Sequence, residues 1–347
     1  MAWLGRGLTG YNRDRYMKTM LAAFALVLIP AAAQDNSPLL KLVQTIPLVK
    51  AEGRIDHLAV DVKRARLYVT ASGSDTVEVV DLKQGAVARS LTGFSKPKGA
   101  LSPAGSNRVF VADGGGTLRI LDAEGLNLIS SVDLSGVPGA LLYDAAARRI
   151  YAGFGDSLAV IDAATGRKLG EVKLPGQPEG FEAEKSGARI FVNLPGTNEI
   201  AVVDRAKLAV SSKIAVTWAQ ENYPMALDEA GHRLLVGARK PGKVLVLDTA
   251  SSEWVTEVAV SDDIGGVLYD ARRKRVYAVC GTAKTQGFAG QIYVMDQMDP
   301  NHYKIRDQVV TAPGARTGLL APELNRLYVA APKKGDQPAK ILVYQTQ

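Results

Sequence analysis

Residues 189–204 read RIFVNLPGTNEIAVVD: an arginine, a short apolar strand, a Pro-Gly turn, and a second alternating strand that ends in aspartate. The arginine with its strand occurs seven times, at spacings of 42, 41, 40, 44, 42 and 51 residues: Arg66, Arg108, Arg149, Arg189, Arg233, Arg275 and Arg326. The second strand ends in aspartate in the first six units: Asp81, Asp122, Asp162, Asp204, Asp248 and Asp296. A repeat of this length that contains only strands is typical of a β-propeller blade.

Four strands are expected in each unit. In the fourth unit, alternating apolar residues and turn residues predict strands over 178–184, 189–193, 199–204 and 207–216. The seventh unit ends after its third strand, and residues 40–49 (LKLVQTIPLV) match the missing fourth strand. Pairing these two segments would remove an open edge that invites aggregation. We therefore predict an all-β fold: a seven-bladed β-propeller of four-stranded antiparallel blades over residues 34–347, with the N-terminal strand closing the last blade.

The repeated polar residues are expected to serve the fold, because a role shared by all units calls for the same residue in all of them. A carboxylate at the end of a strand accepts backbone N–H groups of the following turn, so we expect the aspartates to cap turns. The arginines are expected to be solvated or paired where the second strands begin. Cys280, the single cysteine, ends an apolar strand and is expected to be a small buried residue.

The N-terminal region has the features of a secretory signal peptide. Residues 17–34 read MKTMLAAFALVLIPAAAQ, with a basic residue, an apolar run and a small-residue cleavage site. The apolar run is shorter than a membrane span requires. We therefore predict a signal peptide with an N-terminal extension over 1–33, no membrane span, and export to the periplasm or the medium. Removing this segment takes four basic residues and one acidic residue, so the formal charge falls from +7 to about +4, too small to indicate a dedicated nucleic-acid binder.

The repeats resemble the YVTN-type β-propeller repeats, and the chain after residue 33 resembles the exported YncE-like propeller proteins. The residues that carry this resemblance are the R-[LVI]-[YFL]-[VA] second strands, the [VI]-x-[VI]-[VIL]-D third strands, and turns such as DAATGRKL at 162–169. The resemblance implies a WD40-like propeller fold and a periplasmic or secreted binding protein. Because propellers serve as binding platforms, scaffolds and enzymes, it does not specify a ligand.

The best functional signal lies ten residues before each repeated arginine, where seven loops would converge on the propeller axis. These positions are Asp56, Lys98, Gly139, Glu179, Tyr223, Gly265 and Arg316. A purely structural position should hold similar residues in all units, but this ring is polar and differs from unit to unit. With its polar neighbours it gives the candidate ligand-binding residues Arg54, Asp56, His57, Lys98, Glu179, Asn222, Tyr223, Asp263 and Arg316.

We expect these residues to form a channel mouth that binds a small molecule or an envelope protein without catalysis. One alternative is a lactonase-like hydrolase, because a seven-bladed lactonase family resembles these repeats in architecture. His57 would then act as general base, while Glu179 and Arg316 would orient the substrate or stabilise developing charge. No catalytic motif supports this alternative.

A second alternative is binding of single-stranded nucleic acid, which requires exposed aromatic residues among basic ones. Most aromatic residues here lie inside strands, and the best candidates for exposure, Trp218 and Trp254, fall at the blade periphery. No cofactor or metal is expected, because the three histidines (His57, His232 and His302) lie in different units and no CxxC, CxxCH or phosphate-binding motif is present. We expect a monomer.

Overall fold

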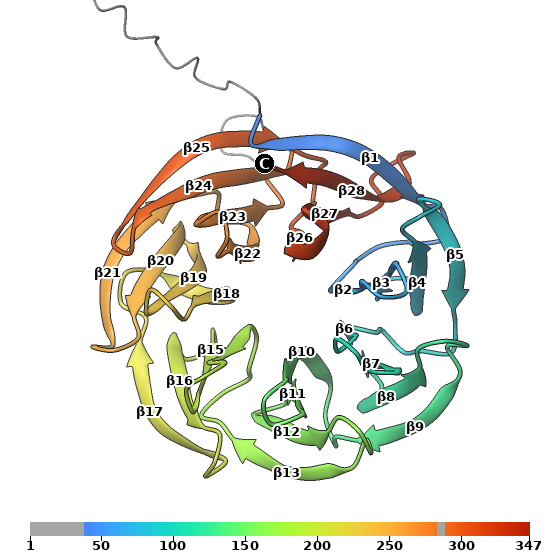
Figure 1. Cartoon of the computed structure of the whole chain (residues 1–347), viewed down its shortest axis with the longest axis horizontal. Helices are drawn as coiled ribbons and strands as arrows, with labels where there is room; N and C mark the ends of the chain where they lie inside the picture. The colour runs from blue at the N-terminus through green and yellow to red at the C-terminus, as the bar shows by residue number, and fades with distance from the viewer. Residues whose placement is uncertain (1–37, 283–288) are drawn as a thin grey trace, which may run out of the picture. The chain divides into compact units, whose positions relative to one another are not determined.

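The computed structural model describes residues 38–282 and 289–347. Their strands form seven four-stranded antiparallel sheets, which are arranged as blades around a central axis with the first strand of each blade innermost (Figure 1). The predicted fold is confirmed. The predicted signal peptide over 1–33 lies outside the described residues, as do residues 283–288. Within the described residues, no helix has the length and apolar character that a membrane span needs.

The first three blades follow one another along the chain. Blade 1 contains β2 (Leu58–Asp61), β3 (Arg66–Ala71), β4 (Thr76–Asp81) and β5 (Ala86–Leu91). Blade 2 contains β6 (Gly99–Leu101), β7 (Arg108–Asp113), β8 (Thr117–Asp122) and β9 (Leu128–Asp133). Blade 3 contains β10 (Pro138–Asp144), β11 (Arg149–Phe154), β12 (Ser157–Asp162) and β13 (Lys168–Lys173).

The next three blades have the same order. Blade 4 contains β14 (Phe181–Ala183), β15 (Arg189–Leu194), β16 (Glu199–Asp204) and β17 (Ala209–Ala215). Blade 5 contains β18 (Gln220–Asp228), β19 (Arg233–Lys240), β20 (Gly242–Asp248) and β21 (Glu253–Ala259). Blade 6 contains β22 (Ile264–Asp270), β23 (Arg275–Cys280), β24 (Gln291–Asp299) and β25 (His302–Val310).

Blade 7 joins the two ends of the described chain. It contains β26 (Thr317–Ala321), β27 (Arg326–Ala331), β28 (Ala339–Thr346) and β1 (Leu40–Leu48), with a short 3-10 helix, η1 (Pro322–Leu324), between β26 and β27. β1 pairs antiparallel with β28 from Leu40 opposite Thr346 to Leu48 opposite Ala339. The N-terminal strand therefore closes the last blade, as predicted.

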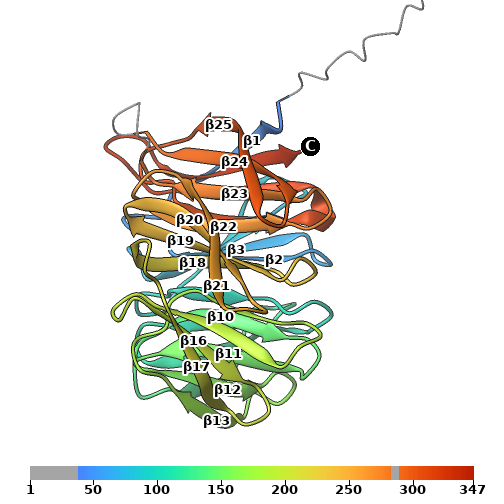
Figure 2. The same cartoon turned by 90° about the vertical axis from the view of Figure 1, so that its left-hand side faces the viewer.

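The core lies between blades. In the described part of the chain, buried apolar side chains form seven clusters, one at each contact between neighbouring blades. Alternation along the strands produces this division: Leu67 and Val69 of β3 pack toward blade 7, whereas Tyr68 packs toward blade 2. Figure 2 shows blades 4, 5 and 6 lying face to face from the side. Each blade buries both faces because each has two neighbours.

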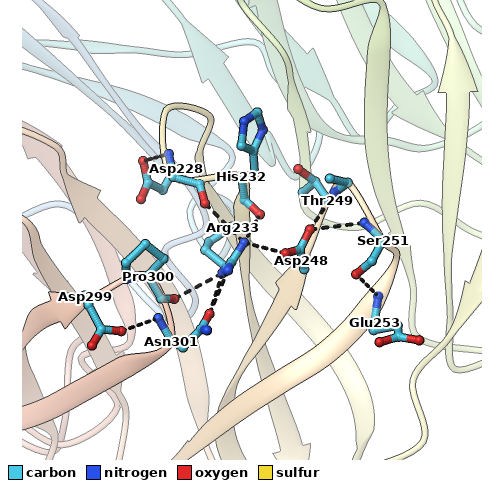
Figure 3. A network of polar contacts seen from close by, with 12 residues as sticks. Asp228, His232, Arg233, Asp248, Thr249, Ser251, Glu253, Asp299, Pro300 and Asn301 are labelled. Atoms are coloured by element: carbon cyan, nitrogen blue, oxygen red, sulfur yellow. Dashed lines mark hydrogen bonds and ion pairs between the residues drawn. The ribbon is translucent and has the colours of Figure 1, made fainter.

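All seven second strands begin at the repeated arginines, and four of these arginines reach a backbone carbonyl of the next blade. The bonds run from Arg66 to Ala123, from Arg189 to Thr249, from Arg233 to Pro300, and from Arg275 to Gln347. Arg233 also pairs with Asp248 at 2.8 Å and donates to Asn301, as Figure 3 shows. These arginines are therefore paired, and they fasten one blade to the next.

Two details of the sequence interpretation are wrong. The first strand of blade 4 covers only Phe181–Ala183, not 178–184, because the backbone at Gly180 turns to donate to Tyr223 of blade 5 at 3.0 Å. The third strand of blade 6 continues past Asp296 to Asp299. The Asp299 carboxylate accepts the turn N–H groups of Asn301 and His302.

Asp296 is instead paired with two arginines, at 2.7 Å to Arg275 and 2.9 Å to Arg306. The other five repeated aspartates cap turns as predicted: the carboxylates of Asp81, Asp122, Asp162, Asp204 and Asp248 each accept backbone N–H groups two to five residues ahead. Cys280 is buried, also as predicted.

Candidate functional site

The ring predicted from the sequence lies around one end of the propeller axis, where the chain enters the first strands. In blades 1, 2 and 4 the ring residue donates its backbone N–H to the same position of the second strand. The bonds run from Asp56 to Thr70, from Lys98 to Ala112 and from Glu179 to Asn193, with N···O distances of 3.0, 2.9 and 3.0 Å. These three residues are therefore equivalent in structure, as the register of the repeats predicted.

The backbone at this end of the channel departs from regular pairing. The register shifts within β10 between Pro138 and Leu141, within β18 between Asn222 and Met225, and within β22 between Ile264 and Gly266. Such irregularities redirect side chains and are common next to functional sites. Here they lie where the innermost strands begin, next to the ring positions Gly139, Tyr223 and Gly265. We call this region the channel mouth.

Blades 1 and 2 contribute a linked set of charged groups to the channel mouth. Arg54 Nε lies 2.5 Å from the Asp56 carboxylate, whose side chain is buried while that of Arg54 is 67% exposed. His57 Nδ1 lies 2.7 Å from the carbonyl oxygen of Lys98, and the imidazole is exposed. A carbonyl can only accept, so Nδ1 carries a proton and Nε2 is the acceptor in the neutral ring.

Glu179 of blade 4 faces these cations. Burial raises the pKa of Glu179 above its usual range, while the charges of His57, Lys98, Arg54 and Arg239 act in the opposite direction. Groups from blades 1, 2, 4 and 5 thus lie within electrostatic reach of one carboxyl. Within the described residues, Glu179 has no hydrogen bond or ion pair through its side chain. Its charge is available to a ligand.

Blades 5, 6 and 7 complete the channel mouth. The Arg239 guanidinium lies 4.0 Å from the centre of the Tyr223 ring, and its Nε donates to the carbonyl oxygen of Ile264 at 2.9 Å. Burial lowers the pKa of Arg239, and the nearby charge of Arg316 lowers it further. Arg316 pairs with Asp263 at 2.6 Å, and both side chains are about one-third exposed. Seven of the nine predicted residues thus lie at a solvent-accessible mouth with Arg239, and Asp56 is buried beside Arg54.

Asn222 is, with Asp56, one of two predicted residues that the structure buries. Its side chain is 0% exposed, and its Nδ2 donates to Asn193 Oδ1 at 2.8 Å and to the Glu199 carbonyl at 3.0 Å. Asn193 in turn donates to the carbonyl oxygen of Tyr223. The pair of asparagines therefore ties blade 4 to blade 5 beneath the mouth, which is a structural role.

Sequence reasoning missed two charged residues of this region. Arg239 lies six residues after a repeated arginine, where the other units have Ser72, Gly114, Gly155, Pro195, Gly281 and Pro332. Glu182 lies seven residues before one, where the other units have Ala59, Leu101, Leu142, Ala226, Leu268 and Leu319. In both cases a single charge replaces small or apolar residues. The same comparison that found the ring would have found them.

Glu182 is an isolated carboxyl on the innermost strand β14 of blade 4. It pairs in register with Phe191, which packs in the apolar cluster shared with blade 5. Its side chain is half-buried, and within the described residues it forms no hydrogen bond or ion pair. Burial raises the pKa of Glu182 to about 7, and Lys185 offsets this only in part. The channel wall therefore holds a carboxyl that changes its charge near neutral pH.

Among the described residues, no three His, Cys, Asp or Glu side chains gather where they could hold a metal ion. The aromatic residues inside the second strands, Tyr68, Phe110, Tyr151 and Phe191, are buried and cannot stack on a nucleic acid. Trp218 and Trp254 lie together at the periphery with ring centres 6.4 Å apart, and Trp254 Nε1 donates to a backbone carbonyl.

Solved structures resemble this chain in fold. A chain of the mitotic checkpoint complex has a TM-score of 0.75 at 12% identity and covers 98% of each chain. The β-propeller domain of Cps50 (Swd1) from Myceliophteria thermophila has a TM-score of 0.69 at 14% identity and covers 89% of this chain and 100% of that one. A chain of hydrazine synthase from Kuenenia stuttgartiensis has a TM-score of 0.72 at 13% identity and covers 86% of this chain and 97% of that one. At these identities the likeness shows the fold alone.

Sequence comparison connects the chain to YncE. No family model matches the sequence, so the resemblance to YVTN-type repeats stays a prediction. The uncharacterised protein YncE of Salmonella typhi and that of Salmonella typhimurium are each 28% identical over 203 residues, which cover 57% of this chain. The chain spans about half the length of these curated relatives, since the match covers 55% of each. The chain is therefore homologous to YncE over this region, and it is a YncE-like seven-bladed β-propeller.

Proposed function

We propose that this protein is an exported, non-catalytic binding protein that holds a small polar molecule at the channel mouth. The observation that carries the proposal is the gathering of charged side chains from six blades at the channel mouth, with cations of blades 1, 2 and 5 within electrostatic reach of the half-buried Glu179. Several of these charges have no counter-charge in contact. Lys98 and Arg239 form no ion pair within the described residues, and Glu179 forms none either.

The charges of the channel mouth suit a polar ligand. Arg54 and Arg316 are each paired with an aspartate, and neither pair is fully buried. Lys98, Arg239 and Glu179 remain to meet a ligand, so a molecule with an anionic group beside a hydrogen-bond donor fits the set. Tyr223 offers little open ring surface, since Arg239 covers one of its faces. Polar contacts are therefore expected to dominate binding.

Export is the second part of the proposal. It rests on the sequence of residues 17–34, with Lys18 ahead of an apolar run and a small-residue cleavage site. A binding protein in the periplasm or the medium would meet small molecules directly. A fusion of residues 1–40 to a reporter enzyme that works only outside the cytoplasm tests this part. Activity of the fusion supports export, and its absence contradicts it.

A ligand screen tests the binding role. The protein is heated with polar metabolites, lactones, metal ions and oligonucleotides, and a ligand present at about 100 times its dissociation constant should stabilise the fold by about 2.7 kcal/mol. The stabilisation should disappear in Lys98→Met, which removes the charge and keeps the apolar stem. Lys63→Met is the matched control, because Lys63 is an exposed lysine in the β2–β3 turn at the other end of the channel.

The outcomes separate the alternatives. Loss of the shift in Lys98→Met but not in Lys63→Met supports the channel mouth as the site. A shift that survives in both variants places the ligand elsewhere and contradicts the proposal. If no small molecule binds, but an envelope protein is retained by the protein and released by Lys98→Met, the mouth is a protein-binding surface.

One observation favours the lactonase-like alternative. The His57 Nδ1 proton is directed to the Lys98 carbonyl, which leaves Nε2 exposed as a base. Glu179 lies within electrostatic reach, but Arg316 is engaged by Asp263. If the protein hydrolyses a lactone, His57→Gln should lower kcat by at least about 100-fold. No turnover above buffer across a lactone panel would exclude this alternative.

A further inference from the structure

The end of the channel opposite the mouth shows how neighbouring blades are fastened together, and where they are not. Five of the seven units carry an acid five residues before the repeated arginine: Asp61, Asp144, Glu184, Asp228 and Asp270. Neighbouring blades meet at seven contacts, and at five of them a side-chain bond at this end of the channel crosses from one blade to the next. Each of these five contacts uses one of the acids, a repeated arginine, or both. Examples are Asp144 to Arg205 at 2.8 Å between blades 3 and 4, and Asp228 to Gln297 at 2.9 Å between blades 5 and 6.

Two units lack the acid, with Pro103 in blade 2 and Ala321 in blade 7. Among the residues described, the contact that each of these two blades makes with the next blade also lacks side-chain bonds at this end. In the described part of the chain, no side-chain hydrogen bond or ion pair crosses this end of the contact between blades 2 and 3 or between blades 7 and 1. The repeated arginines at these contacts are Arg108 and Arg326, and Arg326 donates only to the neighbouring Asn325 carbonyl.

The two unfastened contacts are filled differently. Between blades 7 and 1, Leu324 and Leu82 pack against the shared apolar cluster. The equivalent positions between blades 2 and 3 are Ser106 and Ala163. These smaller side chains leave a cleft of about 610 Å³ that they line together with Arg108, Asp122, Tyr143 and Arg148. A volume of this size is typical of small-molecule sites.

The two arginines of the cleft are not engaged by the protein. Within the described residues, neither the Arg108 nor the Arg148 side chain forms a hydrogen bond or an ion pair. Arg108 Nη1 is buried without a partner. A buried donor that is left unsatisfied costs about 1–3 kcal/mol, so this nitrogen calls for an acceptor. The repeated arginines Arg66, Arg189, Arg233 and Arg275 all have such an acceptor on the next blade.

The remaining lining residues limit the chemistry of the cleft. Asp122 is the one acid among the lining residues, and its two carboxylate oxygens accept the N–H groups of Gly125 and Asn127 at 2.6 and 2.7 Å. These bonds lower the pKa of Asp122, so it stays ionised. Among the lining residues two arginines thus face one carboxylate, while Asp162, beside the lining residue Ala163, lies within electrostatic reach of Arg148. Tyr143 and the half-exposed Ile129 add an aromatic and an aliphatic wall.

We propose that the cleft between blades 2 and 3 binds a small organic anion, whose carboxylate or phosphate is held by Arg108 and Arg148 and whose body lies against Tyr143 and Ile129. The planar guanidinium matches both kinds of anion in a two-pronged geometry. Binding gives Arg108 Nη1 the acceptor that the next blade supplies to four of the other repeated arginines. The site is independent of the channel mouth, which lies at the other end of the channel.

Calorimetric titration of the full chain tests this site with two probes, phenyl phosphate and benzoate, and with neutral benzyl alcohol as reference. At least one anion should bind saturably to a single site, and the stronger of the two identifies the preferred anionic group. Arg108→Gln should weaken that binding by about tenfold or more, the usual loss for a charge-assisted bond. Arg326→Gln is the matched control, because it removes the equivalent arginine at the other unfastened contact. It should leave the affinity unchanged.

A second variant keeps both arginines and removes the space. The double substitution Ser106→Leu and Ala163→Leu places in the cleft the two leucines that fill the equivalent contact between blades 7 and 1, Leu324 and Leu82. It should abolish binding while the thermal midpoint stays the same or rises. The proposal is overturned if neither anion binds saturably at concentrations up to roughly 10 mM, if benzyl alcohol binds as well as the anions, or if binding survives both Arg108→Gln and the filled cleft. Loss of binding in Lys98→Met would also overturn it, since that places the anion at the channel mouth.

Discussion

The two ends of the central channel are built from the same repeat, but they differ in whether their charged side chains recur in every blade and bond to a neighbouring blade. At the end opposite the mouth, the same arginine recurs in every unit, and four of the seven copies donate to a carbonyl of the next blade. At the channel mouth, equivalent positions hold different residues, and among residues 38–282 and 289–347 Lys98, Glu179 and Arg239 have no partner of opposite charge in contact. In this molecule, the repeated charges serve the fold, whereas some of the unrepeated charges at the mouth are left without an ion-pair partner in the part of the chain that the structure describes.

The cleft between blades 2 and 3 shows the converse case, in which a repeated charge has lost its partner. Arg108 belongs to the repeated set, but its partner on the next blade is missing. A repeated residue therefore becomes available when one of its contacts is lost. A position becomes a candidate site in two ways: its residue differs from those at the equivalent positions of other blades, or its residue is the same but lacks the contacts that those residues make.

The largest effect is expected from Arg233, because its guanidinium is nearly buried and bonds to Asp248, Pro300 and Asn301 (Figure 3). Arg233→Ala should lower the free energy of unfolding by about 3 kcal/mol, since it leaves several acceptors without a donor between blades 5 and 6. The urea midpoint measures this loss. If Arg233→Ala were as stable as the unmodified protein, the arginines would not fasten the blades, and the contrast between the two ends would fail.

The second effect concerns the channel between the two ends. Burial raises the pKa of Glu182 to about 7, so the folded protein binds this proton more tightly than the unfolded chain does. Stability should therefore fall as the pH rises from about 4.5 to 7, and this group alone should cost about 2 kcal/mol between pH 5 and pH 8. Glu182→Gln should remove that part of the pH dependence and stabilise the protein at pH 8. Urea midpoints at the two pH values test this.

Glu229 is the matched control for this measurement. Burial alone would raise its pKa, but bonds from Ser186, Lys185 and Gly187 outweigh burial and lower the pKa to about 2. Its contribution is present above pH 4.5 and is lost as the pH falls toward 2. Glu229→Gln should therefore reduce stability at both pH 5 and pH 8. If Glu182→Gln did the same, Glu182 would be a paired carboxylate like Glu229.

The fold was predictable from the sequence because seven copies of one pattern average out local ambiguity. Second strands begin at all seven repeated arginines, and third strands end at the predicted aspartate in blades 1 to 5. The exceptions are places where one blade depends on its neighbour. β14 is short because Gly180 bonds to blade 5, and β24 runs past Asp296 because that carboxylate pairs with Arg275 and Arg306 instead of capping a turn.

The candidate site was predictable in position but not in detail. Counting back from the arginines found the mouth, because structural equivalence follows register. It could not show that Asn222 is buried in a tie to Asn193, since that depends on a register shift within β18. It also passed over Arg239, because this residue enters the mouth from the end of a second strand and not from a first strand. The cleft at Arg108 requires knowledge of contacts, which no single sequence contains.

A smaller effect is expected from the aspartate caps. The Asp162 carboxylate accepts the N–H groups of Ala164 and Thr165 and the hydroxyl of Thr165. Asp162→Ala should cost about 1 kcal/mol, because the turn is exposed and water can replace the lost bonds. Asp162→Asn should recover part of it, since the amide oxygen still accepts. A loss as large as that in Arg233→Ala would mean that the caps, and not the arginines, hold this end of the channel together.

The smallest effect is expected at the channel mouth itself. Arg54 pairs with the buried Asp56 carboxylate at 2.5 Å, but the Arg54 side chain itself is 67% exposed, so the pair is screened by solvent and water can take the place of the guanidinium. Arg54→Ala should therefore change the free energy of unfolding by no more than about 0.5 kcal/mol. The same substitution at Arg233 is expected to cost several times more, although both residues are paired arginines at an end of one channel. A stability loss at Arg54 equal to that at Arg233 would show that the mouth, too, is built for the fold, and it would remove the main reason to expect a ligand there.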